Sequence, residues 1–154
     1  MRKKPLEIFV DGASKGNPGE AGVGIVICQN GEVEKNISRY IGQATNNVAE
    51  YMALIFALQQ ALMDKATEVL IKTDSQLLCN QINKEFKVKN ANLKPLFAQA
   101  EHLIGAFESF KIVHIPREMN KGADKLATKA IREQARMAAP TYRRGGKSGL
   151  KRAA

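Results

Sequence analysis

Acidic residues stand at four positions from which their carboxylates could share a metal ion. Asp11 and Asp74 each end a predicted strand, and Glu50 lies about one turn into a predicted helix. Asp124 lies in the first turn of the last predicted helix. Alone, each acid has an ordinary explanation as a turn residue, an exposed helix acid or a partner of the helix dipole. Gathered together, they would resist burial unless a cation neutralised them. All-oxygen ligands suit Mg²⁺ or Mn²⁺, so the four acids predict a hard divalent-metal site.

Hydrophobic periodicity predicts the elements that must carry these acids. Strands are predicted at residues 6–11, 22–28, 32–41, 68–74 and 110–116. Helices are predicted at residues 46–65, 76–84 and 93–107 and from about residue 120 onward. The order βββαβααβα predicts an α/β fold, a five-stranded mixed sheet of three antiparallel plus two parallel strands flanked by helices.

Local signals support the boundaries of these elements. Asn30-Gly31 is a two-residue hairpin signal between the second and third strands. Thr45 or Asn46 can cap the first helix and Ser75 the second. If the first and fourth strands are parallel neighbours, the acids at their ends lie at the same edge of the sheet, where sites of α/β folds form.

Composition and charge favour a globular protein with a polyanionic partner. A chain of 154 residues is long enough for one domain with a sizeable core. No apolar run is long enough for a transmembrane helix, and no signal peptide is expected. Cys28 and Cys79 fit no disulfide framework or zinc cluster, so we expect buried free thiols and a cytoplasmic protein. The net charge of +9 and pI near 9.7 favour nucleic acid over membrane as the partner.

The positive charge is concentrated at the C-terminus. Residues 140–154 carry five basic residues and no acid, and the glycine-rich stretch 145–149 is typical of a flexible segment. We therefore divide the chain into a catalytic domain, residues 1–139, and a basic C-terminal tail, residues 140–154. The tail is either a solvated extension or an auxiliary contact to a nucleic-acid backbone.

Short motifs surround each of the four acids. They read DGASKGNPG at residues 11–19, TNNVAEY at 45–51, TDS at 73–75 and NKGADKLA at 120–127. In this order and spacing, across residues 5–139, they resemble the motifs of the type 1 ribonuclease H family. The resemblance implies the ribonuclease H-like fold described above.

The resemblance also implies an activity. Members of this family are endoribonucleases that hydrolyse the RNA strand of RNA/DNA hybrids with two metal ions, leaving 5′-phosphate and 3′-hydroxyl ends. By resemblance, Asp11 bridges two Mg²⁺ (or Mn²⁺) ions, Glu50 and Asp74 complete the ligands of one, and Asp124 those of the other. The expected partner is an RNA/DNA hybrid, with no membrane, no obligate protein partner and a monomeric state.

Similarity to the family also suggests residues that hold the substrate. Asn17, Asn46 and Asn47 correspond to residues near the minor groove, where the 2′-hydroxyl distinguishes RNA from DNA. Thr45 and Asn90 correspond to residues at a phosphate of the DNA strand. For each of the five, an ordinary loop or capping role remains open.

Two features depart from the family pattern. Many members carry a histidine in the loop before the last acid, but here that short link lacks one, and Arg117 or Glu118 is a possible replacement. His114 falls earlier, inside a predicted strand, where we interpret it as structural. Some members also insert a basic handle after the second helix. Here the segment is too short, so substrate contact would depend on Lys84, Lys87, Lys89 and the tail.

Three other functions are compatible with parts of the pattern. A non-catalytic hybrid-binding module would normally have lost one or more of the acids. An integrase or junction resolvase of the same superfamily is disfavoured by the TNNVAE motif and the compact length. A structural protein with incidental acids does not account for the four motifs.

Overall fold

The computed structural model describes residues 4–145, and side chains as far as residue 137. The first three strands, β1 (Leu6–Ser14), β2 (Gly19–Gln29) and β3 (Glu32–Ala44), follow one another directly. They are followed by α1 (Asn46–Met63), β4 (Glu68–Thr73), α2 (Gln76–Ile82), α3 (Lys94–Ile104), β5 (Ser109–His114), the 3₁₀ turn η1 (Arg117–Met119) and α4 (Lys121–Gly145). The predicted order of strands and α-helices is confirmed.

The five strands form one mixed sheet in the order β3-β2-β1-β4-β5. β1 pairs antiparallel with β2, which pairs antiparallel with β3, whereas β4 is parallel to both β1 and β5. β1 takes a central position because its apolar side chains Ile8 and Val10 are fully buried. Val10 is in register with Thr73, so Asp11, the next residue of β1, and Asp74, the residue that follows β4, lie at the same part of the sheet.

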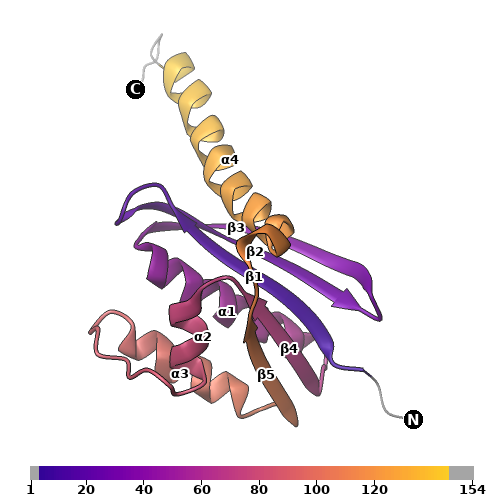
Figure 1. Ribbon diagram of the computed structural model, residues 1–154. Coiled ribbons are helices and arrows are strands. Elements are labelled where there is room, and N and C mark those ends of the chain that lie inside the picture. The colour runs from indigo at the N-terminus through magenta and orange to yellow at the C-terminus, as the bar shows by residue number, and fades with distance from the viewer. Residues whose placement is uncertain (1–3, 146–154) are drawn as a thin grey trace.

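Helices cover the two faces of the sheet, with α1, α2 and α3 on one face and α4 on the other (Figure 1). Buried leucines and alanines of α1, such as Leu54 and Leu58, belong to the main core with the inner residues of β1 and β4. α4 packs chiefly on β2 through Ala123, Ala127 and Ile131. Cys28 and Cys79 are buried free thiols, as predicted. None of the described helices has the length and hydrophobicity needed to cross a membrane.

The predicted end of the first strand was wrong, and the predicted division between domain and tail lies within a helix. β1 does not end at Asp11, because Gly12, Ala13 and Ser14 continue to pair with β2 and leave only residues 15–18 as the turn. The proposed boundary at residues 139 and 140 falls inside α4, which continues to Gly145. The rest of the predicted tail, residues 146–154, lies outside the described part of the chain.

Glycines allow two helices to approach the sheet closely. A Cβ on Gly24 of β2 would lie 1.9 Å from the carbonyl oxygen of Ala123 in α4. A Cβ on Gly12 of β1 would lie 2.2 Å from the carbonyl carbon of Ala49 in α1. Backbone atoms cannot yield as a flexible side chain can, so any larger residue would push the helix outward.

Gly24→Ala should therefore destabilise the fold by about 2 kcal/mol or more, because α4 must move to relieve the clash. Gly105→Ala is a matched control, since its Cβ would meet its nearest atom at 3.5 Å and its φ is −63°. Urea unfolding would measure both changes. Equal free energies of unfolding for the two variants would contradict the packing described for α4.

Candidate active site

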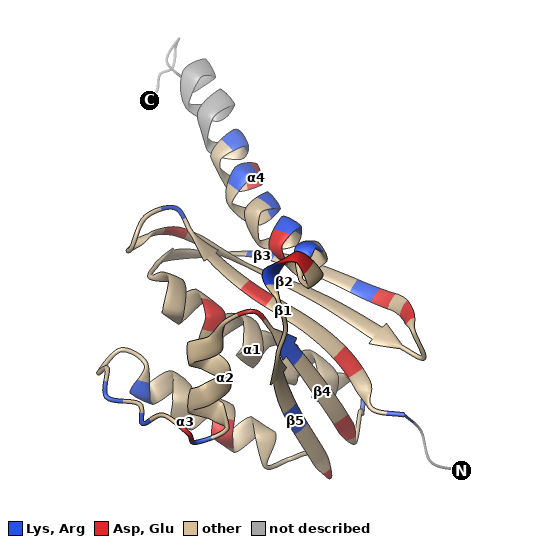
Figure 2. Cartoon of the chain, in the orientation of Figure 1, with Lys and Arg blue, Asp and Glu red and all other residues tan. Residues whose placement is uncertain are grey.

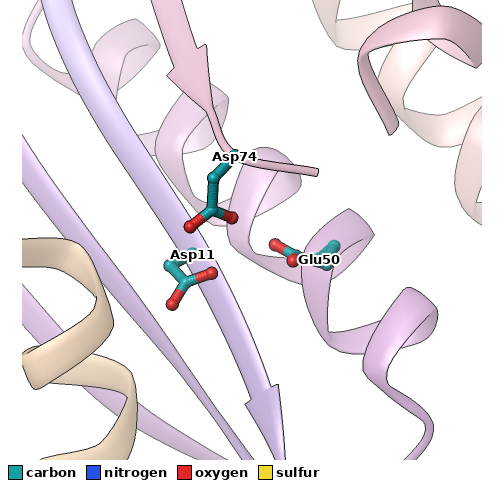
Figure 3. A group of neighbouring side chains, drawn as sticks. All are labelled: Asp11, Glu50 and Asp74. Atoms are coloured by element: carbon teal, nitrogen blue, oxygen red, sulfur yellow. The ribbon is translucent and has the colours of Figure 1, made fainter. Parts of the chain in front are cut away.

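Three carboxylates from separate elements converge at the edge of the central strands. Asp11 belongs to β1 and Glu50 to α1, and Asp74 is the residue that follows β4. One oxygen of each lies within 4.8 Å of the others. Figure 3 shows the three side chains turned toward one another. The structure thus brings together three of the four acids that the sequence singled out.

A backbone N–H holds one of these carboxylates in place, and local hydrogen bonds shape the turn that carries another. The N–H of Gly12 donates a hydrogen bond to Oε1 of Glu50 at 3.0 Å, across the close contact between β1 and α1. Beside Asp74, the N–H of Ser75 donates to Oγ1 of Thr73 at 3.0 Å, and the Ser75 hydroxyl caps α2. The turn after β4 is therefore shaped by its own side chains.

The fourth acid, Asp124, approaches Asp11 from the other face of the sheet. It lies in the first turn of α4, and a side-chain hydrogen bond with it contributes to the raised pKa of Asp11. Buried Asn120 fixes the start of this helix. Its side-chain Nδ2 donates to the backbone carbonyl of Val10 at 2.9 Å, and its backbone carbonyl accepts from the N–H of Asp124. The sequence showed Asn120 only as part of a motif, because its partner lies 110 residues away.

The crowding of acids has a clear electrostatic consequence. Burial, and then the charges of Glu50 and Asp74, raises the pKa of Asp11 to about 9. Burial, and then the charge of Asp74, raises the pKa of Glu50 to about 8, although the Gly12 N–H and the charge of Arg117 act in the opposite direction. Deprotonated carboxylates at this spacing need a neutralising cation. Oxygen-only ligands this close together fit a hard divalent ion such as Mg²⁺ or Mn²⁺.

Arg117 is a feature whose position the sequence could not establish. It begins η1, and its charge lies near enough to oppose the rise in the pKa of Glu50. Neighbouring Glu118 is exposed, and His114 is exposed at the end of β5. Two residues were considered as replacements for the missing histidine. Of these, Arg117 is the one whose charge acts on a carboxylate of the site.

The asparagines near the start of α1 form a hydrogen-bonded network. The N–H of Asn46 donates to Oδ1 of Asn17 at 3.0 Å, and the N–H of Ser14 donates to Oδ1 of Asn46 at 3.0 Å. Because backbone N–H groups are donors, both amide oxygens are occupied as acceptors and both NH₂ groups remain available as donors. Donors at this position can serve the acceptors of a minor groove.

A small hollow of about 190 Å³ lies beside this network. Four of the five predicted substrate-binding residues line it, namely Asn17, Thr45, Asn47 and Asn90. Thr45 caps α1 by accepting from the N–H of Val48, so its hydroxyl proton stays free to donate. The oxygen of Asn90 accepts from the N–H of Asn92 at 2.7 Å, which leaves its NH₂ group as a donor.

The lysines expected to contact the substrate lie on the segment after α2. Lys84 pairs with Glu101 at 3.4 Å, and Lys87 lies beside a second hollow that Phe86 and Phe97 also line. Lys89 is exposed within the same segment. The short segment thus presents cations on the surface without any inserted handle.

The repulsion at this site should be measurable as a loss of stability. The pKa of Asp11 in the folded protein far exceeds that of an unfolded aspartate, so folding becomes less favourable as pH rises between the two values. In EDTA at pH 8, the free energy of unfolding of Asp11→Asn should therefore be larger than that of the wild type by at least about 1 kcal/mol. This difference corresponds to a rise of about 2–4 °C in the unfolding midpoint.

Unfolding midpoints in EDTA at pH 5 and pH 8 would check this expectation, and the gain should be larger at pH 8. The exposed Glu32→Gln should show no such gain. An Asp11→Asn protein no more stable than the wild type at pH 8 would show that burial and neighbouring charges do not raise the pKa of Asp11.

Comparison with known proteins places these features in a family. A model of the family described as "Reverse transcriptase-like" matches residues 9–130. The bifunctional protein Rv2228c of Mycobacterium tuberculosis is 40% identical over 86% of this chain, which spans 37% of that protein. Ribonuclease HI of Halobacterium salinarum is 37% identical over 82% of this chain, which spans 64% of that protein.

Solved structures agree. The halobacterial ribonuclease H1 superimposes with a TM-score of 0.82 at 36% identity, covering 84% of this chain and 99% of that one. The LC11 ribonuclease H1 from compost, crystallised in complex with an RNA/DNA hybrid, gives a TM-score of 0.81 at 41% identity, covering 84% and 99%. From its fold, its clustered carboxylates and these matches, the chain belongs to the type 1 ribonuclease H family.

Proposed function

We propose that this protein is a metal-dependent endoribonuclease that hydrolyses the RNA strand of RNA/DNA hybrids, leaving 5′-phosphate and 3′-hydroxyl ends. The observation that carries the proposal is the convergence of Asp11, Glu50 and Asp74 within 4.8 Å on a ribonuclease H fold. The relative crystallised with an RNA/DNA hybrid supports the choice of substrate. The cytoplasmic location suggested by composition stays a prediction.

The acids would hold two Mg²⁺ or Mn²⁺ ions, with Asp11 shared, Glu50 and Asp74 serving one ion, and Asp124 serving the other. When bound, such ions activate water and stabilise the charge that develops on the phosphate oxygens. The chain itself contributes the geometry: Gly12 orients Glu50, and Asn120 anchors the helix that brings Asp124 beside Asp11. No side-chain nucleophile is required, in agreement with the all-carboxylate site.

Substrate recognition would use the amide network and the adjoining hollow. The NH₂ groups of Asn17, Asn46 and Asn47 suit the minor-groove acceptors and 2′-hydroxyls of the hybrid. Thr45 and Asn90, which share the hollow, suit a phosphate of the DNA strand. We expect the protein to work on the hybrid as a monomer, without an obligate protein partner.

The alternatives fit the site less well. A hybrid-binding module without activity has no use for a buried carboxylate cluster that repels itself. An integrase or resolvase would cut duplex DNA, so its substrate is included in the test below.

End-labelled RNA/DNA hybrid, duplex DNA and duplex RNA should be incubated with the protein in Mg²⁺ or Mn²⁺. We expect cleavage of the hybrid's RNA strand, and a loss of at least about 100-fold in kcat for Asp74→Asn, which removes a metal ligand. Product ends would be identified with a phosphatase and a kinase. Equal cleavage of duplex DNA, or full activity in Asp74→Asn, would refute the proposal.

Arg117 should contribute to the same reaction, because a guanidinium near the carboxylates can hold a phosphate oxygen of the substrate. Arg117→Ala should lower kcat by at least about 10-fold, and Arg117→Lys should restore part of the loss. Glu118→Gln, one residue away on η1, is the matched control. Loss of activity in Glu118→Gln but not in Arg117→Ala would assign the role to Glu118 instead.

A further inference from the structure

Helix α4 continues well past the sheet on which it packs. Among its side chains as far as Met137, the last buried one is Ile131, and the backbone of the helix extends to Gly145 (Figure 1). From Arg132 to Met137 no side chain is buried. Burial therefore does not explain why the chain keeps a helix here, since helices gain most of their stability from packing.

The exposed face of this helix carries a row of cations, which we call the α4 basic stripe. All of its members are exposed, and they recur every three or four residues: Lys121, Lys125, Lys129, Arg132 and Arg136. Figure 2 shows basic positions repeating along α4 toward its grey end. At this spacing the cations share one face, opposite the face that Ala123 and Ala127 bury on β2.

Few acids balance this stripe. In the described part of α4, Glu133 pairs with Lys129 at 3.9 Å, and Asp124 is engaged at the carboxylate site. An ordinary solvated helix face mixes charges so that opposite signs alternate at four-residue spacing. The stripe instead presents a continuous positive surface about 22 Å long, the rise of fifteen helical residues.

We infer that the α4 basic stripe binds the phosphate backbone of nucleic acid, without regard to sequence, along a surface that begins beside Asp124 and continues outward from the catalytic carboxylates. Its length corresponds to about six base pairs of duplex. This contact goes beyond the proposed function, because it requires neither cleavage nor a hybrid.

The structure favours nucleic acid over a membrane surface or another protein as the partner of the stripe. A helix that lies in a membrane interface buries its apolar face in lipid, but the apolar face of α4 is already packed on β2. From Lys121 to Met137, α4 has no aromatic residue that could anchor a protein interface. Regularly spaced exposed cations are instead the pattern that contacts phosphates.

The test neutralises the outer part of the stripe, away from Asp124, with Lys129→Gln, Arg132→Gln and Arg136→Gln in one variant. A matched control removes the same charge elsewhere with Lys4→Gln, Lys35→Gln and Lys111→Gln, all exposed positions off α4. Fluorescence anisotropy would measure binding of the full chain to a DNA duplex of about 20 base pairs in EDTA, across a salt series.

The stripe variant should bind about 10-fold more weakly at 0.1 M salt, and its log Kd should depend less steeply on log salt, by about one unit per lost phosphate contact. The control should change affinity less than about 2-fold, and both variants should keep the wild-type unfolding midpoint. The kcat on saturating hybrid should not change in the stripe variant.

Equal loss of affinity in both variants, or no loss in the stripe variant, would overturn the inference. So would normal DNA binding by a stripe variant that no longer binds vesicles containing phosphatidylglycerol, since the partner would then be an anionic membrane. Failure of the wild type to cleave hybrid would count against the proposed function and leave the binding result standing.

Discussion

Mutual repulsion among Asp11, Glu50 and Asp74 is the constraint on which the rest of the structure depends. Burial, and then the charges of neighbouring acids, raises the pKa values of Asp11 and Glu50, so these acids favour protonation or separation. The surrounding fold must therefore oppose the separation. It does so by attaching each acid to an element that is held by many contacts elsewhere, so that no single carboxylate can move away alone.

Three features of the packing hold these elements in place. β1 lies in the centre of the sheet, where both neighbours fix its position. α1 touches β1 at Gly12, whose N–H also orients Glu50. α4 rests on Gly24 and is tied to β1 by Asn120, which places Asp124 beside Asp11. The clustered carboxylates are electrostatically unfavourable by themselves, and the favourable packing of the surrounding elements keeps them together. A bound cation would reduce the electrostatic free energy that remains unfavourable.

The charges of the molecule are unevenly placed. Four of the fifteen acids gather at one site of a chain with a net charge of +9, and cations are spread over the surface, most regularly along α4. Surface cations attract a polyanion over long range, whereas the buried acids repel it until metal ions neutralise them. Under the two proposals made above, the systems have different roles: the surface would bring nucleic acid close, and the carboxylate site would accept its backbone only when metal is bound.

The sequence by itself determined the order of strands and helices, the cap Ser75 and the acids' places on those elements, because periodicity and capping are local properties. It left the cap of α1 open between Thr45 and Asn46, where the structure has Thr45, and it misplaced the end of β1, since pairing with β2 depends on more than turn residues. Only the tertiary structure decided that Asn120 bonds to Val10 and that the charge of Arg117 lies near Glu50. These contacts join residues far apart in the chain, and no local pattern encodes distance in space.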